Sequence, residues 1–370
     1  MKSPKDLRHI LHENPEISFS EYETTNTLEK SIKELAEETK TEIKILKPIS
    51  TGLIADYKIN SGEYFIFRAD IDALPIKEKT ECEFISRNEN MHACGHDIHM
   101  SVLYGFMKYV FENRIDKNIL FVFQPGEESG GGAKEIIDSG IFNAYKIKNA
   151  FALHVTDEYK KGQIATTNGV LFASAMEIDV EFFGKPAHIA FPYDGINAFD
   201  SLRFFLDSAD KIPKNISNPV ILGVGIINAG NVRNIIPSYA SVKGSIRAVT
   251  MNHASEYKEK LEKILYSLKV FNSSESKITV GSFYHEVFND KNLSEKFMKV
   301  LSEEFEVIDC GTKMTGEDFG FFGELCPSFM SWLGTAESEE RFGLHSDKFL
   351  PGDDVIEIGI RYFTEIIKNV

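Results

Sequence analysis

The segment MHACGHDIHM, residues 91–100, concentrates side chains that bind transition metals. Cys94 and His96 flank Gly95, directly before a stretch that has the apolar spacing of a helix. Thiolate and imidazole are preferred ligands of zinc and similar divalent ions, and an i, i+2 pair on an extended loop can converge on one ion. A loop with a buried cysteine and surface histidines is the alternative. Three histidines and one cysteine within ten residues favour the metal site.

Two adjacent carboxylates, Glu127 and Glu128, follow a predicted apolar strand in FVFQPGEESGGG. This is the end of a strand at which α/β proteins place their active sites. One carboxylate can bind a metal while its neighbour, which points elsewhere, accepts a proton from water. A solvated acidic turn is the other interpretation. The glycines that follow match neither phosphate-loop pattern, and the two carboxylates would repel phosphate, so we exclude a phosphate site.

Other candidates also stand at the ends of predicted strands. Asp70 and Asp72 of RADIDALP lie on one side of an extended chain and could orient a metal-binding histidine, although an ordinary turn is the alternative. His154 closes the apolar run AFALHV, and His345 lies in GLHSDKF. A single histidine that closes a buried strand is more often a satisfied core or edge residue than a ligand, but such residues at several strand ends of one sheet favour a shared centre. No G-x-S-x-G elbow supports a serine hydrolase, whereas Cys94 as a nucleophile with a histidine base stays open.

The elements that must position these residues alternate between helix and strand. Ser3 and Pro4 open a first helix, and Ser20 with Glu23 forms the pattern of a capping box for a second. Short apolar strands separated by helices indicate an α/β sheet that is buried on both faces. The strands are expected at about 42–46, 52–58, 64–69, 119–123, 150–155 and 328–333, and the helices at about 20–38, 98–113, 132–139, 291–305, 317–324 and 354–368.

The pattern changes near residue 174. MEIDVEFFG alternates apolar and other residues with a period of two, which is typical of a half-solvated antiparallel strand. A helix at about 195–211, strands at 220–228 and 239–248 and a helix at 254–269 follow. We therefore expect an α/β protein with a mainly parallel sheet in a discontinuous domain, 1–173 and 284–370. An α+β, ferredoxin-like domain at 174–283 would interrupt it.

Composition narrows the class of protein. The chain has 370 residues, 42% of them hydrophobic and 26% charged, which is a globular composition long enough for two domains. A net charge of -15 argues against nucleic acid or an anionic membrane as main partner. The longest apolar run, 220–227, is too short to span a bilayer, and no signal peptide is expected. Four cysteines do not form a disulfide framework, so we expect a cytoplasmic enzyme.

Several motifs occur in the order found in dinuclear-metal amidohydrolases of the aminoacylase and carboxypeptidase-G type. The sequence resembles the branch with a Cys-Gly-His motif, as in hippurate hydrolases, over nearly its whole length. Within that branch, GVLFAS, TGEDFG and FMSWLG are most similar to the enzymes that deacetylate N-acetyl-diaminopimelate in lysine biosynthesis. The motifs in order are RADIDALP, NMHACGHDIHM, FQPGEESGGGAKEII, ALHV, GKPAHIAFP, NIIP, GSIRA, TGEDFGFF and GLHSDKF.

This resemblance implies a set of roles. The implied ligands of two divalent ions (zinc, manganese or cobalt) are Cys94, His96, Glu128, His154 and His345. The implied catalytic residues are Glu127 as general base, with Asp70 and Asp72 in support. The implied substrate-binding residues are His188, which often acts across a dimer, Asn234 and Arg247. The family fold further implies that the insert is a lid and mediates a homodimer. Gly126, where the family more often has alanine, is a departure.

The resulting hypothesis is hydrolysis of an N-acyl amide on a small amino acid, here N-acetyl-diaminopimelate. Its distal ammonium needs an acidic partner, for which Glu317 and Asp318 are candidates; capping of the following helix is the alternative. A broader amidohydrolase acting on other N-acyl amino acids is the alternative function. A metal-binding protein without catalysis and a cysteine hydrolase that uses Cys94 are the rivals from other classes.

Overall fold

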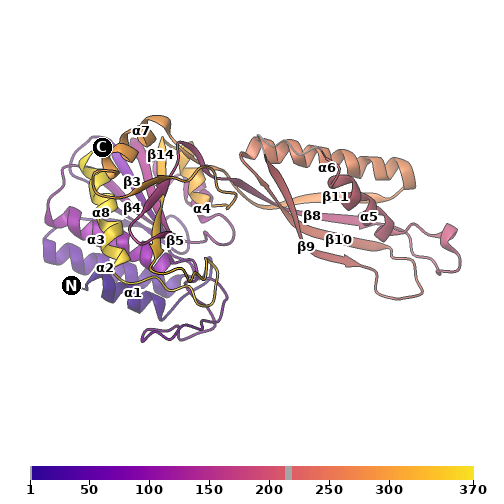
Figure 1. The fold of residues 1–370 in the computed structure, drawn as a ribbon, viewed down its shortest axis with the longest axis horizontal. Coiled ribbons are helices and arrows are strands. Elements are labelled where there is room, and N and C mark those ends of the chain that lie inside the picture. Colours follow the sequence, from indigo (N-terminus) through magenta and orange to yellow (C-terminus); the bar gives the residue numbers. More distant parts are fainter. Residues whose placement is uncertain (1, 213–218) are drawn as a thin grey trace. The chain divides into compact units, whose positions relative to one another are not determined.

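The computed structural model describes residues 2–212 and 219–370. The chain divides into two compact units, both drawn in Figure 1. The first comprises Met1–Leu171, Val287–Gly311 and Asp318–Val370, and the second comprises Phe172–Glu286 and Thr312–Glu317. No helix in the described part of the chain is both long and apolar enough to cross a membrane.

The second unit is slightly larger than the segment 174–283 expected from the sequence. It takes up 172–173 and 284–286, and also the separate stretch Thr312–Glu317. That stretch joins because its backbone pairs with the start of the insert: Phe172 forms a bridge with Lys313, and the Ala173 amide donates to the Lys313 carbonyl at 2.8 Å. Alternation of hydrophobic residues cannot reveal such a pairing between distant segments.

The first unit is built on a sheet of ten strands within the described residues. Its four middle strands run parallel, and the two strands at one edge run antiparallel to their neighbours, so the predicted mainly parallel sheet is confirmed. The main path is β1 (Lys44–Leu46), β2 (Leu53–Tyr57), β4 (Asn118–Gln124), β3 (Tyr64–Asp70), β5 (Ile147–Lys160), β14 (Ser328–Ala336), β12 (Val287–Asn289) and β7 (Gly169–Phe172). Two short strands lie off this path, β6 (Ile164–Thr166) and β13 (Val307–Asp309).

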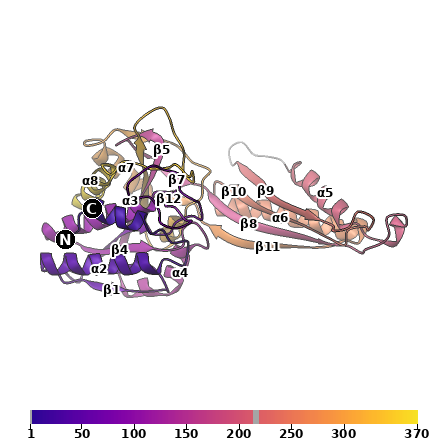
Figure 2. The ribbon, with the colours of Figure 1, turned by 90° about the horizontal axis from the view of Figure 1, so that it is seen from below.

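Helices cover this sheet, and α3 and α8 lie side by side against it in Figures 1 and 2. The β3 residue Phe67 joins them, because its ring lies 4.6 Å from Phe106 of α3 and 5.2 Å from Phe363 of α8. All three rings are buried, and each burial contributes about 1.5–3 kcal/mol. The helices are α1 (Pro4–His12), α2 (Tyr22–Thr39), α3 (His96–Glu112), α4 (Gly132–Asp138), α7 (Lys291–Leu301) and α8 (Val355–Lys368), with 3-10 turns at Ile141–Ala144 and Asp318–Glu324.

The helix starts differ in how well the sequence predicts them. Ser3 caps α1 as expected, and its hydroxyl accepts from the Asp6 amide. The predicted capping box of Ser20 with Glu23 is wrong, because the cap residue of α2 is Glu21 and has no side-chain cap bond. The carboxylate of Glu16 accepts from the first amides of this helix instead, at 3.2 and 2.8 Å. A cap supplied from outside the local pattern leaves no local signal.

The second unit is a four-stranded antiparallel sheet in the order β11-β8-β10-β9, with two helices. The alternating residues of β8, from Met176 to Phe182, are buried in its core, as the period of two predicts. Strand β11 was not predicted; with it the order β-α-β-β-α-β is that of a ferredoxin-like fold. The elements are β8 (Ser174–Phe183), α5 (Ala198–Ala209), β9 (Val220–Ala229), β10 (Tyr239–Ala248), α6 (Met251–Asn272) and β11 (Glu275–Tyr284).

Candidate metal centre

The candidate ligands come from elements at one edge of the parallel sheet. Strand β3 ends at Asp70, β4 ends three residues before Glu127, and β5 carries His154. These three strands run parallel, so their carboxyl ends lie at the same edge. The loop before α3 brings Cys94 to this edge, and α3 begins at His96.

The five predicted ligands lie close to one another. The Cys94 Sγ is 3.5 Å from the His154 Nε2 and 3.4 Å from the His345 Nε2. The Glu128 Oε1 is 3.3 Å from the His345 Nε2 and 3.9 Å from the His96 Nε2. Ligands that share one zinc-like ion lie about 3.3–3.6 Å apart when bonds of about 2.0–2.3 Å meet at tetrahedral angles. Three of the four distances therefore fit ligands that share a divalent ion, and the Glu128–His96 distance is slightly longer.

Hydrogen bonds orient two of the imidazoles toward this centre. The Nδ1 of His96 is 2.9 Å from the Asp72 carbonyl, and the Nδ1 of His154 is 2.8 Å from the Val155 carbonyl. A carbonyl oxygen only accepts, so each Nδ1 carries a proton and donates it. This leaves the Nε2 of each ring to face the cluster, as in histidines that bind metals.

Electrostatics of the site also fit a cation. The Nε2 of His96 and the Oε1 of Glu128 are buried with no hydrogen-bond partner. Burial opposes protonation of His96, but the carboxylates of Asp70 and Asp72 outweigh it and raise its pKa to about 10. Burial, with the nearby Glu128, raises the pKa of the Cys94 thiol well above its usual value. Negative charge that favours a proton on His96 equally favours a metal ion, which would in turn hold the cysteine as thiolate.

One histidine of the cluster received no role from the sequence. His99 lies within 4.8 Å of the ligand atoms of Asp70, His96 and His154. Its Nε2 accepts from the Val155 amide at 2.9 Å, so its Nδ1 carries the proton and donates to the Asp70 Oδ1 at 2.6 Å. Both nitrogens are thus engaged, and His99 holds Asp70 against strand β5. Its position three residues after His96 on a helix was the only available signal.

The two predicted supporting aspartates are fully buried and have different partners. Asp72 Oδ2 accepts from the Ser18 hydroxyl at 2.7 Å and from the Glu128 amide at 2.9 Å, which fixes the loop that carries Glu128. Asp70 accepts from Arg68 at 2.7 Å. Although burial opposes ionisation, the nearby histidines and Arg68 hold the pKa of Asp70 well below its usual value.

Arg68 links this support to Asp318, one of the two predicted ammonium ligands. The Arg68 Nη2 donates to Asp318 at 2.7 Å, and Gln124 donates to it at 2.8 Å. The Ala133 amide donates to the other oxygen at 3.0 Å. Asp318 is thus part of a buried network beneath the site, and Glu317 is buried as well. Binding of a substrate ammonium by this pair stays a prediction.

Glu127, the predicted base, is buried on a tightly held turn. The preceding Gly126 has φ +67°, and a Cβ at this position would lie 2.6 Å from the ring of Phe19. Its amide donates to the Glu21 carboxylate at 2.9 Å. The departure at Gly126 therefore has a structural cause in this chain. The turn carries both carboxylates past the half-buried ring of Phe19, and alanine would be strained here.

The predicted substrate residues of the second unit fall into two groups. His188 forms a bridge with Ile235, and the Ile189 amide donates to the Asn234 carbonyl at 3.1 Å, so His188 and Asn234 lie together in an exposed region beyond the end of β8. Arg247 pairs with Ala175 at the start of β8. Strand β8 rises about 3.4 Å per residue, so the eight residues from Ala175 to its end separate the two ends by about 27 Å. Within one chain, His188 and Arg247 do not meet.

Comparison with known proteins shows the family of this chain. Residues 66–369 match the family described as peptidase family M20/M25/M40. The chain belongs to this family. The resemblance to dinuclear-metal amidohydrolases found in the motifs is thereby confirmed.

Curated relatives match this chain over nearly their full length. An N-acetyldiaminopimelate deacetylase of Geobacillus sp. (strain WCH70) is 37% identical over 98% of this chain and 96% of the relative. One from Priestia megaterium is 36% identical over 98% and 97%. Among solved structures, a dinuclear metal-binding M20 peptidase from Bacillus subtilis superposes with a TM-score of 0.83, at 25% identity and over 99% and 98% of the two chains. A putative aminohydrolase from Staphylococcus aureus, at 22% identity, shares the fold with a TM-score of 0.90 over 99% and 96%.

Proposed function

We propose that this M20 protein removes the acetyl group from N-acetyl-diaminopimelate and releases acetate and diaminopimelate, a step of lysine biosynthesis in the cytoplasm. The observation that carries the proposal is the meeting of Cys94, His96, Glu128, His154 and His345 at one sheet edge, in a chain that is 34–37% identical to three deacetylases of that name. These five side chains would hold two divalent ions of zinc, manganese or cobalt.

The reaction needs an acid–base group beside the ions. Bound divalent ions supply Lewis acidity to the acyl carbonyl and to the attacking water. Glu127 accepts the proton from that water and delivers it to the departing amine, because an amine cannot leave as an anion at neutral pH. The Asp72 carboxylate accepts from the backbone amide of Glu128 and so keeps Glu128 in place. The His99 ring donates to Asp70 and holds that side chain. On this turn, Glu128 would bind metal and Glu127 would transfer the proton.

Substrate binding would involve the second unit. Arg247 would hold the substrate carboxylate through a bidentate pair, and His188 would stabilise the developing oxyanion with Asn234 nearby. Because His188 lies about a strand length from Arg247 in one chain, we propose that His188 and Asn234 serve the active site of a partner subunit.

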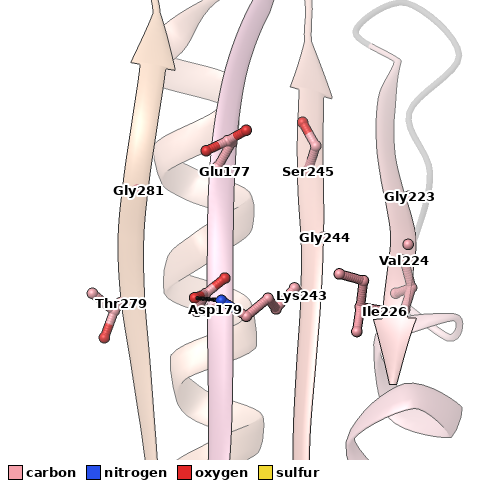
Figure 3. Close-up of a pocket in the computed structure, with 11 residues that line it drawn as sticks. Glu177, Asp179, Gly223, Val224, Ile226, Lys243, Gly244, Ser245, Thr279 and Gly281 are labelled. Atoms are coloured by element: carbon pink, nitrogen blue, oxygen red, sulfur yellow. Dashed lines mark hydrogen bonds and ion pairs between the residues drawn. The ribbon is translucent and has the colours of Figure 1, made fainter. Parts of the chain in front are cut away.

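A homodimer through the inserted domain is supported by strand β9. It is the end strand of the order β11-β8-β10-β9 among the described residues, and ten residues without lysine or proline leave its edge open to pairing. Ile221, Ile226 and Ile227 are about half exposed. Figure 3 shows the adjoining sheet face, where Lys243 pairs with Asp179 at 2.7 Å in front of the strands and a helix lies behind them. Light scattering should report a dimer, and Ile226→Lys should shift it toward monomer with lowered activity; an unchanged dimer would exclude this edge.

The rival functions predict other behaviour. A cysteine nucleophile needs a lowered thiol pKa, whereas burial and the carboxylates around Cys94 raise it. A metal-binding protein without catalysis has no use for the buried Glu127 beside the ligands.

Metal depletion tests the proposal. Dialysis against a chelator should abolish acetate release from N-acetyl-diaminopimelate, and adding back zinc, manganese or cobalt should restore it. A panel with hippurate and N-acetyl-methionine tests the substrate: preference for either would replace the deacetylase by the broader amidohydrolase. Thiol reagents that inactivate while chelators have no effect would establish the cysteine hydrolase.

A further inference from the structure

A second group of side chains with nitrogen, oxygen and sulfur atoms that could bind a metal lies in the first unit, apart from the five proposed ligands of the dinuclear centre. His12 is on α1, and Glu78 and Cys82 are on the long segment between β3 and α3. Their ligand atoms all lie within 4.8 Å of one another. The His12 Nε2 is 3.1 Å from the Glu78 Oε1, and that oxygen is 3.8 Å from the Cys82 Sγ. Tetrahedral zinc places such atoms about 3.3–3.6 Å apart, so small shifts would suffice.

The imidazole of this group is already oriented by another carboxylate. The Nδ1 of His12 is 2.9 Å from the Asp97 Oδ2, and the same oxygen accepts from Arg8 at 3.0 Å. Side chains of His12, Asp97 and Arg8 are 1–2% exposed, so the arrangement is built into the core. A carboxylate on the far nitrogen of a histidine is the usual partner of a metal-binding imidazole, because it fixes the ring and raises the basicity of the near nitrogen.

We propose that His12, Glu78 and Cys82 form an additional binding site for a zinc-like divalent cation, separate from the dinuclear centre. The ligand set of one nitrogen, one oxygen and one sulfur matches zinc or cobalt rather than magnesium or calcium. The Thr80 hydroxyl, 3.5 Å from the Cys82 Sγ and hydrogen-bonded to Glu78, lies beside the site.

Binding requires that protons leave. Burial disfavours the charged form of His12, yet Asp97 and Glu78 outweigh it and raise its pKa to about 9, and burial raises the pKa of the Cys82 thiol. The cation would therefore take the place of the proton between His12 and Glu78 and of the thiol proton, releasing two protons and leaving the ligands as imidazole, carboxylate and thiolate.

The location gives the site a structural consequence. Cys82 and Glu78 are on the segment that leads from Asp72 to Cys94, and His12 is on the first helix of the chain. A cation there would tie this segment to α1, as the His12–Glu78 hydrogen bond does without metal. A bound cation would make the segment from Asp72 to Cys94 more rigid without replacing any ligand of the dinuclear centre.

Zinc stoichiometry of the full-length protein tests the proposal. After equilibrium dialysis against zinc, elemental analysis should find one zinc per subunit more in the wild type than in Cys82→Ser. Cys310→Ser is the matched control, since Cys310 is also half-buried but belongs to none of the ligand groups found among the described residues, and it should keep the wild-type number. Equal stoichiometry in the wild type and Cys82→Ser would overturn the proposal.

Cobalt gives a second readout that does not depend on activity. In a Cys94→Ala background the catalytic thiolate is absent, so a thiolate-to-cobalt charge-transfer band that remains belongs to another cysteine. We expect this band in Cys94→Ala and its loss in Cys82→Ser/Cys94→Ala. Absence of the band from Cys94→Ala, or its persistence in the double variant, would contradict a site at Cys82.

Discussion

The buried guanidinium of Arg68 offers the sharpest test of how the metal centre is supported. Arg68 donates to Asp70 and to Asp318, both at 2.7 Å, and all three side chains are 0% exposed. Arg68→Met keeps most of the side-chain volume and leaves two buried carboxylates without their cation. Removing one partner of a buried ion pair costs about 3–5 kcal/mol, which is a large part of the stability of a domain.

An exposed ion pair of the same length provides the matched control for Arg68→Met. Arg87 contacts Glu13 at 2.7 Å with its side chain 68% exposed, so Arg87→Met should cost about 0–1 kcal/mol. Urea denaturation at neutral pH, followed by a probe in the first unit, measures both changes. Equal losses of stability in the two variants would refute the argument that the buried network supports Asp70.

Three further predictions concern the same unit. Gly126→Ala should lower kcat at least about tenfold in steady-state kinetics, because the new methyl group clashes with an aromatic ring and the positive φ is strained for alanine. Gly311→Ala is the control: it has φ +60° but lies in open space, so kcat should not change. Burial raises the pKa of Glu21 to about 6, so the stabilising contribution of this carboxyl is complete below about pH 4.5 and is lost as the pH rises through 6. Between pH 4.5 and 7 the free energy of unfolding of Glu21→Gln should therefore rise by about 2 kcal/mol relative to that of the wild type, as measured by denaturation curves. A difference that stays constant with pH would contradict this. His99→Phe removes the hydrogen bond to Asp70 and should weaken metal binding about 10–100-fold in a chelator competition. An unchanged metal affinity would mean that the His99 ring only fills space.

The candidate metal ligands could be proposed from the sequence because most of them adjoin a recognisable element. Cys94 precedes the helix that begins at His96, Glu128 follows an apolar strand and His154 lies in one, and parallel strands bring such positions to one edge. His345 had only its motif, since it lies in a loop with a φ of 64°. The two-unit division was visible in the change of hydrophobic period near residue 174, since a half-solvated sheet alternates and a buried one does not.

Other features are visible only in the folded structure, because the residues that cause them lie far apart in the chain. Arg68 is indistinguishable in sequence from a residue of a buried strand, and its role depends on Asp318, 250 residues away. His99 shares a helix face with His96, yet the spacing cannot say whether a histidine binds metal or orients a carboxylate. The separation of His188 from Arg247 within one chain follows from strand register, which no local pattern encodes.

The central claim is that Glu127 transfers the proton while neighbouring side chains hold the metal. Turnover of N-acetyl-diaminopimelate by Glu127→Gln, measured together with its metal content, tests this most directly. We expect kcat to fall at least about 100-fold with the metal stoichiometry of the wild type retained, because general base catalysis contributes about 10²–10⁴-fold. Turnover near that of the wild type in a fully metallated Glu127→Gln variant would contradict the assignment.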